Sequence, residues 1–285
     1  MNNYIYLLMS LAMISWAMAW TNAHIVNQYI PSYYNLVFLR FLLGFISLFP
    51  LMIFKKKIII FDVNIFKYIF PASLLFLLYN ISFFIATQSA DVGRGAILVT
   101  TINPIITLMI VTIINKKIKK NEIIGIMIGM FGGAIILDLF SKGIINIISE
   151  NNIYFVFCAL TWGIMTVVIT YGQKIINPLN FIFLCYLFTT LFSIPFVDFF
   201  NFGIENWDAK FYFNFFLVSI GAMSFGTSIY MYSTSLMGPV KSSVFIFSVP
   251  FLAMSISTIF LNEIITLQTI IGGLLSLLAI YIVNK

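Results

Sequence analysis

Long apolar segments alternate with short polar breaks along the whole chain. Ten of these segments are long enough to cross a membrane as helices, because a spanning helix needs about 20 mostly apolar residues. The expected spans are 4–24, 32–54, 67–90, 93–114, 122–140, 151–172, 178–197, 211–234, 241–261 and 266–283. The apolar residues run in blocks and do not alternate over ~10-residue segments, which disfavours a β-barrel. The pattern therefore predicts an all-α membrane protein with ten transmembrane helices.

Turn-forming and charged residues mark the breaks between these segments. Pro31-Ser32, Asn177-Pro178 and Gly238-Pro239 are turn signals. The lysine runs at 55–57 and 116–120 are costly to place in hydrocarbon. The first segment has neither a basic leader nor a small-residue cleavage site, so we expect it to be retained as a helix.

Composition and charge support the same interpretation and add an orientation. Hydrophobic residues make up 61% of the 285 residues and charged residues only 8%, against about 25% in an average soluble protein. Eleven Lys residues fall on the side that carries both termini, and three Lys or Arg residues on the other. The positive-inside rule then places both termini in the cytoplasm. The net charge of +6 is thus an orientation signal, and no nucleic-acid partner is expected.

The two halves of the chain repeat each other at an offset of about 147 residues. The matched pairs are Pro31 with Pro178, Arg94 with Lys241, Asn115 with Asn262, Gly125 with Gly272, Trp16 with Trp162, and Pro104 with Pro250. Each half holds five spans, and an odd number inverts the second half relative to the first. Inverted repeats place a ligand site near the bilayer midplane between the halves and permit alternating access. We expect the repeats to cover residues 1–141 and 146–285.

At these positions the sequence resembles the drug/metabolite transporter superfamily, in particular its ten-helix EamA-type members. The second half carries the clearest match, in Gly238 to Ser243, Pro250, Leu261-Asn262-Glu263 and Gly272. The first half resembles the family through Trp16, Arg40, Pro104 and Gly125. It departs from the family at Lys117, where a glutamate is usual, and at Ala17, where glycine is common. These departures concern local packing.

The resemblance implies a secondary transporter of small metabolites, often an exporter of amino acids or related compounds. Two alternatives stay open at this point: a non-transporting receptor or scaffold, and a transporter of nucleotide- or sugar-type metabolites. A membrane enzyme is disfavoured because one His and scattered carboxylates offer no acid–base or metal constellation. The abundance of Ile, Asn, Lys and Phe is typical of an AT-rich genome and suggests a bacterial inner membrane.

Arg40 is the most informative single side chain of the sequence. It lies about 12 Å from the outer end of its span, where a charge costs at least about 2.5–3.5 kcal/mol. The functional interpretation is an anchor for a substrate carboxylate or phosphate, and the structural one is a partner for helix-end carbonyls or snorkelling. None of the nine acidic residues lies near the centre of a span, which disfavours proton-coupled antiport of cationic drugs.

Other polar and aromatic residues near mid-span complete the candidate substrate site. They are Trp16, Tyr79, Asn80, Asn103, Thr161, Trp162, Ser224, Thr227 and Ser248. Each polar group needs a partner in hydrocarbon; either a wet central cavity or an interhelical hydrogen bond provides one.

Four further residues are candidates for gating. Pro104 and Pro250 each remove a backbone hydrogen bond inside a span and are candidate hinges. Arg94 and Lys241 open matched spans on opposite faces and are candidate gate residues, with snorkelling to head groups as the alternative.

The sequence predicts neither a metal nor a cofactor. His24 has no second ligand type nearby, and Cys158 and Cys185 fall inside apolar segments as small core residues. The expected partners are a small-molecule substrate and the lipid bilayer, with a monomer as the working assembly.

Overall fold

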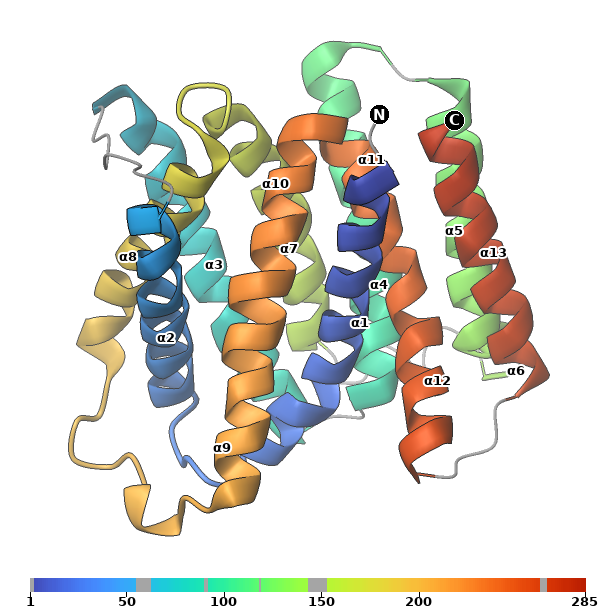
Figure 1. Ribbon diagram of the computed structural model, residues 1–285. Helices are drawn as coiled ribbons and strands as arrows, with labels where there is room; N and C mark the ends of the chain where they lie inside the picture. Colours follow the sequence, from blue (N-terminus) through green and yellow to red (C-terminus); the bar gives the residue numbers. More distant parts are fainter. Residues whose placement is uncertain (1–2, 55–62, 90–91, 118, 143–152, 262–265) are drawn as a thin grey trace.

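The computed structural model describes residues 3–54, 63–89, 92–117, 119–142, 153–261 and 266–285, and within them it is helical without β-strands (Figure 1). The first half contains α1 (Asn3–Val26), α2 (Tyr33–Phe54), α3 (Val63–Ser89), α4 (Val92–Asn115), α5 (Lys120–Ile136) and the short α6 (Leu139–Lys142). The second half begins with α7 (Ile153–Gly172), α8 (Pro178–Ser193) and the 3₁₀ turns η2 (Ile194–Phe196) and η3 (Ile204–Asn206). It continues with α9 (Ala209–Phe216), the π-helix η4 (Leu217–Thr227), α10 (Ser228–Met237), α11 (Pro239–Ser243), the 3₁₀-helix η5 (Val244–Phe247), α12 (Ser248–Leu261) and α13 (Leu267–Asn284).

Side-chain caps fix the starts of several helices. Asn177 precedes α8, and its Oδ1 accepts from the backbone N–H of Asn180 at 3.0 Å. Asp208 caps α9 through the N–H of Phe211 at 2.8 Å. Such caps satisfy backbone donors that have no partner within the helix. The turn signals Asn177-Pro178 and Gly238-Pro239 thus coincide with the starts of α8 and α11.

Nine helical segments of the described chain are long and apolar enough to cross a membrane. The expected span 122–140 is a shorter helix in the structure than the sequence predicts. Helix α5 ends at Ile136 after 17 residues, which corresponds to about 26 Å at 1.5 Å per residue. Asp138 then adopts a left-handed backbone conformation with φ of 54°, which ends the helix although the apolar run continues into α6.

The two halves pack as inverted copies. Both termini lie at one face, at the top of Figure 1, which we call the terminal face. Helix α5 runs beside α13 and α2 beside α8, while the contact of α3 with α7 is matched by that of α1 with η4. The contact of α4 with α7 is likewise matched by that of α1 with α12. Exchanging the halves thus reproduces the packing, as five-helix repeats of opposite topology require.

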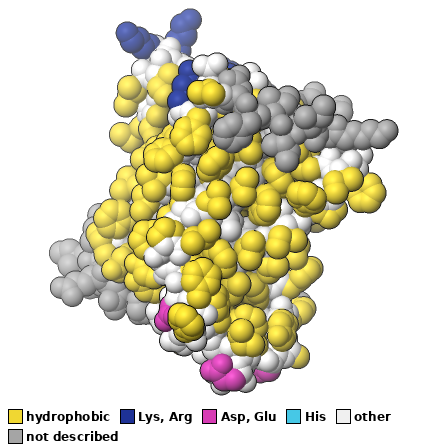
Figure 2. All heavy atoms as spheres, turned by 90° about the vertical axis from the view of Figure 1, so that its left-hand side faces the viewer, with side chains coloured by type: hydrophobic (Ala, Val, Ile, Leu, Met, Phe, Trp, Pro, Cys, Tyr) yellow, Lys and Arg dark blue, Asp and Glu magenta, His cyan; other side chains and the backbone are white. Residues whose placement is uncertain are grey.

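Charged side chains gather at the two ends of the molecule. Figure 2 shows an apolar band between basic side chains at the terminal face and acidic ones at the opposite face. Exposed apolar residues on the membrane-spanning helices include Leu7, Met109 and Leu274. The band is the surface that a multi-pass membrane protein turns to lipid. The lysine run at 55–57 and the carboxylates Asp91, Glu150 and Glu263 lie outside the described residues.

Candidate functional site

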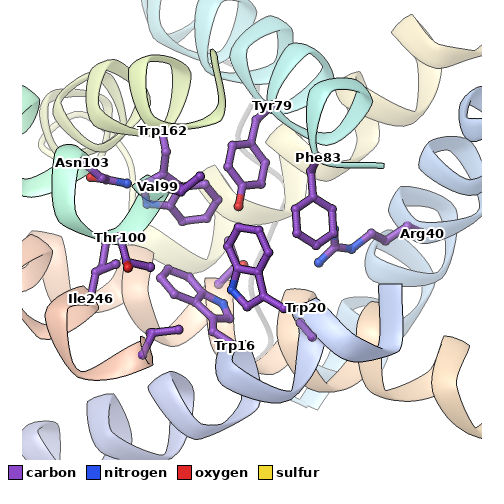
Figure 3. A pocket seen from close by; sticks show the side chains of 13 residues that line it. Trp16, Trp20, Arg40, Tyr79, Phe83, Val99, Thr100, Asn103, Trp162 and Ile246 are labelled. Atoms are coloured by element: carbon purple, nitrogen blue, oxygen red, sulfur yellow. The ribbon is translucent and has the colours of Figure 1, made fainter. Parts of the chain in front are cut away.

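A small cavity lies inside the helix bundle, where helices of both halves meet (Figure 3). The first half contributes α1, α2, α3 and α4, and the second contributes α7, η4, η5 and α12. Its lining consists of Trp16, Ala19, Trp20, Arg40, Tyr79, Phe83, Val99, Thr100, Asn103, Trp162, Thr227, Ile246 and Val249. The volume is about 50 Å³, which is room for roughly three or four waters at ~10–15 Å³ each. An amino acid does not fit without expansion.

Aromatic rings form most of the cavity wall. The Trp16 and Trp162 rings meet edge to face with centroids 4.9 Å apart, and Tyr230 lies 5.1 Å from Trp16 and 5.7 Å from Trp162. The Tyr230 and Thr166 hydroxyl oxygens are also hydrogen-bonded to each other, at 3.0 Å. Both Tyr230 and Thr166 lie about one turn closer to the terminal face than the cavity residues of their helices. The three rings therefore close the cavity on that side.

Arg40 supplies the cavity with a buried positive charge. Its side chain is only 6% exposed, and Nη1 donates to Oδ1 of Asn80 at 2.7 Å. The guanidinium also lies over the rings of Phe83 and Phe84, 5.4 and 5.7 Å from their centroids. Among the described residues, Nε has no hydrogen-bond partner. A charge held by one neutral amide and two rings keeps an unbalanced attraction for an anion.

Asn103 and Trp162 bring unpaired polar atoms to the same cavity. Asn103 is 1% exposed and its Oδ1 has no hydrogen-bond partner among the described residues, while the Trp162 indole N–H faces the Tyr230 hydroxyl without meeting hydrogen-bond geometry. In Figure 3 the amide and the indole point toward each other. If the Asn103 amide turned by half a rotation, its Oδ1 would face the indole N–H. Alternatively, a bound solute could donate a hydrogen bond to Oδ1 and accept one from the indole N–H. An unpaired buried polar group costs about 1–3 kcal/mol, so this pair favours a ligand or water.

The π-helix η4 contributes Thr227 to the cavity wall and packs against α1 and α2. Its wider turns leave the carbonyl of Ala222 able to accept from the Trp16 indole N–H at 3.0 Å and from the Thr227 hydroxyl at 3.2 Å. Gly226 lets α1 approach, since a Cβ there would lie 2.6 Å from the Ser15 Oγ and 2.9 Å from the Trp16 Nε1. π-Helical segments are rare and occur often at functional sites. Here the segment orients Trp16 and brings Thr227 to the cavity.

Comparisons with known proteins assign the chain to a family. The EamA-like transporter family matches residues 3–138 and 151–285. The chain belongs to the EamA-like transporter family. It is therefore a multi-pass membrane transporter of the drug/metabolite transporter type, as the resemblance predicted, and the family consists of transporters rather than enzymes.

A search of curated proteins found no match. Among solved structures, a similar one is described only as "Crystal structure of protein". It is 13% identical with a TM-score of 0.74, over 99% of this chain and 96% of the other. At this identity the likeness concerns the fold alone.

Six of the expected substrate-site residues of this EamA-family chain line the cavity. They are Trp16, Arg40, Tyr79, Asn103, Trp162 and Thr227. The Tyr79 ring lies 4.8 Å from Trp162 and stacks on Phe83 at 6.0 Å. The structure thus brings together six of the ten residues that the sequence suggested for a substrate site.

The other four expected residues lie outside the cavity lining. Asn80 holds Arg40 and donates to the Phe76 carbonyl at 2.9 Å, so it positions the guanidinium. The Thr161 and Ser248 hydroxyls bond to carbonyls of their own helical turns. The Ser224 hydroxyl pairs with Ser47 at 2.7 Å. In each case a neighbouring protein group satisfies the polar atom, so the atom does not need a cavity.

The gate and hinge candidates differ in placement. Pro104 lies inside the continuous helix α4, one residue after the cavity residue Asn103. Pro250 lies in the first turn of α12, directly after the 3₁₀-helix η5. Lys241 lies in α11, and its Nζ donates to the Asn284 carbonyl at 3.1 Å at the terminal face, away from the cavity. The side chain of Arg94 lies outside the described residues.

Sequence reasoning missed seven lining residues. They are Ala19, Trp20, Phe83, Val99, Thr100, Ile246 and Val249. Trp20 and Phe83 follow Trp16 and Tyr79 by four residues, and Thr100 precedes Asn103 by three. Residues three and four apart share a helix face, so this spacing was the available signal.

Within the part of the chain that the structure describes, no three His, Cys, Asp or Glu side chains gather as metal ligands would. The single His24 instead bonds through Nδ1 to the Thr87 carbonyl at 2.8 Å.

Proposed function

We propose that this transporter carries a small metabolite with a carboxylate, an amino acid or a related compound, and exports it by alternating access. The observation that carries the proposal is the buried Arg40 at the cavity wall, whose one hydrogen-bonding partner on Nη1 is the neutral amide of Asn80. A charge at this depth costs at least about 2.5–3.5 kcal/mol. A substrate carboxylate would offset that cost through charge-assisted hydrogen bonds to the guanidinium.

The rest of the lining suits the other parts of an amino acid. Oδ1 of Asn103 and the hydroxyls of Thr100 and Thr227 are acceptors within the lining for an ammonium group. The rings of Trp16 and Trp162 can hold the ammonium by cation–π attraction or pack against an apolar side chain. A nucleotide or sugar phosphate carries more charge than the single cation of this cavity would match, which favours the amino acid.

The shape of the cavity supports transport by alternating access. At about 50 Å³ the cavity is too small for an amino acid, so loading requires the helices around it to separate. The layer of Trp16, Trp162 and Tyr230 closes the terminal side. Inverted halves give a second state of opposite access at little structural cost, by rocking of one half against the other.

The charge distribution supports an orientation of the chain in its membrane. Basic side chains at the terminal face and acidic side chains opposite (Figure 2) support cytoplasmic termini. We place the protein in a bacterial inner membrane with the closed side of the cavity toward the cytoplasm, and export as the net direction.

Exchange of labelled solutes in proteoliposomes tests this proposal. A panel of amino acids, nucleosides and sugar phosphates would identify the substrate. Exchange of the amine obtained by removing the carboxylate from that substrate would then test the role of the carboxylate. We expect Arg40→Ala to abolish exchange of the amino acid, Arg40→Lys to retain part of it, and Lys210→Ala, at the opposite face, to behave as wild type.

Two results would count against the proposal. Unchanged amino acid exchange by a folded Arg40→Ala protein would remove Arg40 from substrate binding. Failure of both Arg40 variants to fold, with the wild type inactive on every solute, would favour a structural role for the arginine and the scaffold alternative.

A further inference from the structure

A basic recess lies at the terminal face, far along the helices from the central cavity. Its first part is a cleft of about 650 Å³ between the α4–α5 turn and the α10–α11 break, and it includes Lys117, Lys119, Glu122 and Lys241. A neighbouring cleft of about 370 Å³ shares Lys119, Glu122 and Lys241 and adds Lys120 and Lys285. Five lysines thus line a recess whose described lining contains one acidic side chain, that of Glu122.

That carboxylate is already engaged at the start of α5. Oε2 of Glu122 accepts from the backbone N–H of Lys119 at 3.3 Å, as in a capping box. Lys241 is held by the Asn284 carbonyl, which fixes its position but does not neutralise its charge. Among the described residues, the recess therefore keeps more lysine ammonium groups than carboxylates.

The recess continues into a third cleft of about 230 Å³ on the other side of Gly238 and Pro239. This cleft adds Lys174, stacked over the Tyr171 ring at 4.3 Å, and Gln173. Gln173 is only 8% exposed, and its Nε2 has no hydrogen-bond partner among the described residues. A buried, unpaired amide donor in a cleft with one ammonium group, adjoining a cleft with several more, suits an anion with several oxygen acceptors.

The surroundings of the recess indicate that this anion belongs to a lipid. Ile113, Ile114 and Leu236 flank it on α4 and α10 and are 72%, 50% and 54% exposed. These residues lie at the ends of membrane-spanning helices, where lipid acyl chains would cover them. Charge for a headgroup and apolar surface for its chains thus adjoin each other.

We propose that the recess binds the phosphate headgroup of an anionic phospholipid from the leaflet at the terminal face, with its acyl chains along Ile113, Ile114 and Leu236. The bound lipid bridges the α4–α5 turn of the first half and the α10–α11 break of the second. The first connection follows α4, which contributes to the cavity wall, and the second lies between η4 and η5, which both contribute to it. The lipid therefore stabilises one relative placement of the halves.

Native mass spectrometry of the full-length protein in detergent, titrated with phosphatidylglycerol or phosphatidylcholine, tests the proposal. Lys117→Gln with Lys241→Gln removes two charges from the recess, and Lys67→Gln with Lys210→Gln removes two charges elsewhere. We expect the recess pair to weaken phosphatidylglycerol binding about 25-fold, from about fivefold per lysine, which corresponds to ~1 kcal/mol each. The control pair and Lys117→Arg with Lys241→Arg should bind phosphatidylglycerol as wild type does.

Each alternative outcome has a definite meaning. Equal weakening by the two Gln pairs would show general charge attraction and overturn the site. If the wild type bound phosphatidylcholine as tightly as phosphatidylglycerol, the preference for an anionic headgroup would be overturned. Displacement of the lipid by inorganic phosphate at comparable concentration would make this a site for a soluble anion. If the double variant Lys117→Gln with Lys241→Gln does not fold, the double Arg variant provides the test. A folded double Arg variant that no longer binds phosphatidylglycerol more tightly than phosphatidylcholine would contradict the proposal. None of these readouts depends on the transported substrate.

Discussion

Replacing Asn80 by aspartate would place a carboxylate directly beside the buried guanidinium of Arg40. Asparagine and aspartate have nearly the same volume, so the cavity wall keeps its shape. In the native chain Oδ1 of Asn80 lies 2.7 Å from Nη1 of Arg40, and the aspartate oxygen would take that position with a full negative charge. The substituted side chain would then compete with the carboxylate of the substrate for the same cation.

The size of this effect follows from the strength of the contact that the substrate loses. A hydrogen bond to a charged group contributes about 1.5–3 kcal/mol, and each 1.4 kcal/mol is about tenfold in affinity. We therefore expect Asn80→Asp to raise the KM for an amino acid by about 10- to 100-fold, while its decarboxylated amine is transported no worse. Asn80→Ala removes the same amide without adding charge and should shift the KM much less.

The assay is exchange in proteoliposomes for the three proteins, with thermal unfolding as a control for folding. Equal KM values for the amino acid in a folded Asn80→Asp protein and the wild type would refute the reasoning. Equal shifts in Asn80→Asp and Asn80→Ala would show that the amide itself, and not the charge of Arg40, determines binding.

Two further predictions concern the scaffold. Gly272→Ala should lower the free energy of unfolding by about 1–3 kcal/mol, because its Cβ would lie 2.6 Å from the Gly132 carbonyl oxygen where α5 meets α13. The control is Gly221→Ala, whose Cβ would meet only a Leu217 methyl at 3.9 Å. Equal thermal midpoints of the two variants would contradict this close packing. Hydrogen bonds from the backbone N–H of Phe211 and, to a smaller extent, from the Tyr29 hydroxyl hold the pKa of Asp208 below its ordinary value. The ionised Asp208 therefore stabilises the folded protein above about pH 4, and this stabilisation is lost as the pH falls through the lowered pKa. Thermal unfolding against pH should show a smaller acid-side loss in Asp208→Asn, and identical profiles would exclude the contribution.

The architecture was predictable because it follows from the hydrophobic pattern. Segment lengths, turn residues and the repeat of Trp16 at Trp162 predicted ten helices in two inverted halves, and the packing pairs of the structure agree. The end of α5 was not predictable from hydrophobicity, since the break depends on the left-handed backbone at Asp138. The repeat boundaries 1–141 and 146–285 stay predictions.

The candidate site was predictable only in part. Arg40 and Asn103 stand out because burying them in hydrocarbon is costly, and both line the cavity. The hydroxyls of Thr161 and Ser248 do not stand out in this way, because a hydroxyl can bond to a carbonyl of its own helix. The position of a polar residue at mid-span therefore does not reveal which way it faces.

The π-helix η4 could not be anticipated either. Residues 217–227 have the same apolar character as any spanning helix, and the wider turn depends on tertiary contacts such as the bond from Trp16 to the Ala222 carbonyl. That turn brings Thr227 into the cavity.

Side-specific labelling of a cysteine in the cavity tests the central claim most directly, namely that the cavity between the inverted halves opens alternately to the two sides of the membrane. Thr100→Cys places a thiol in the cavity lining, and the wild type, whose Cys158 and Cys185 are buried, is the blank. We expect a membrane-impermeant thiol reagent to label Thr100→Cys from either side of oriented vesicles, and saturating substrate to slow both reactions. Labelling from one side alone under every condition, with or without substrate, would contradict the account.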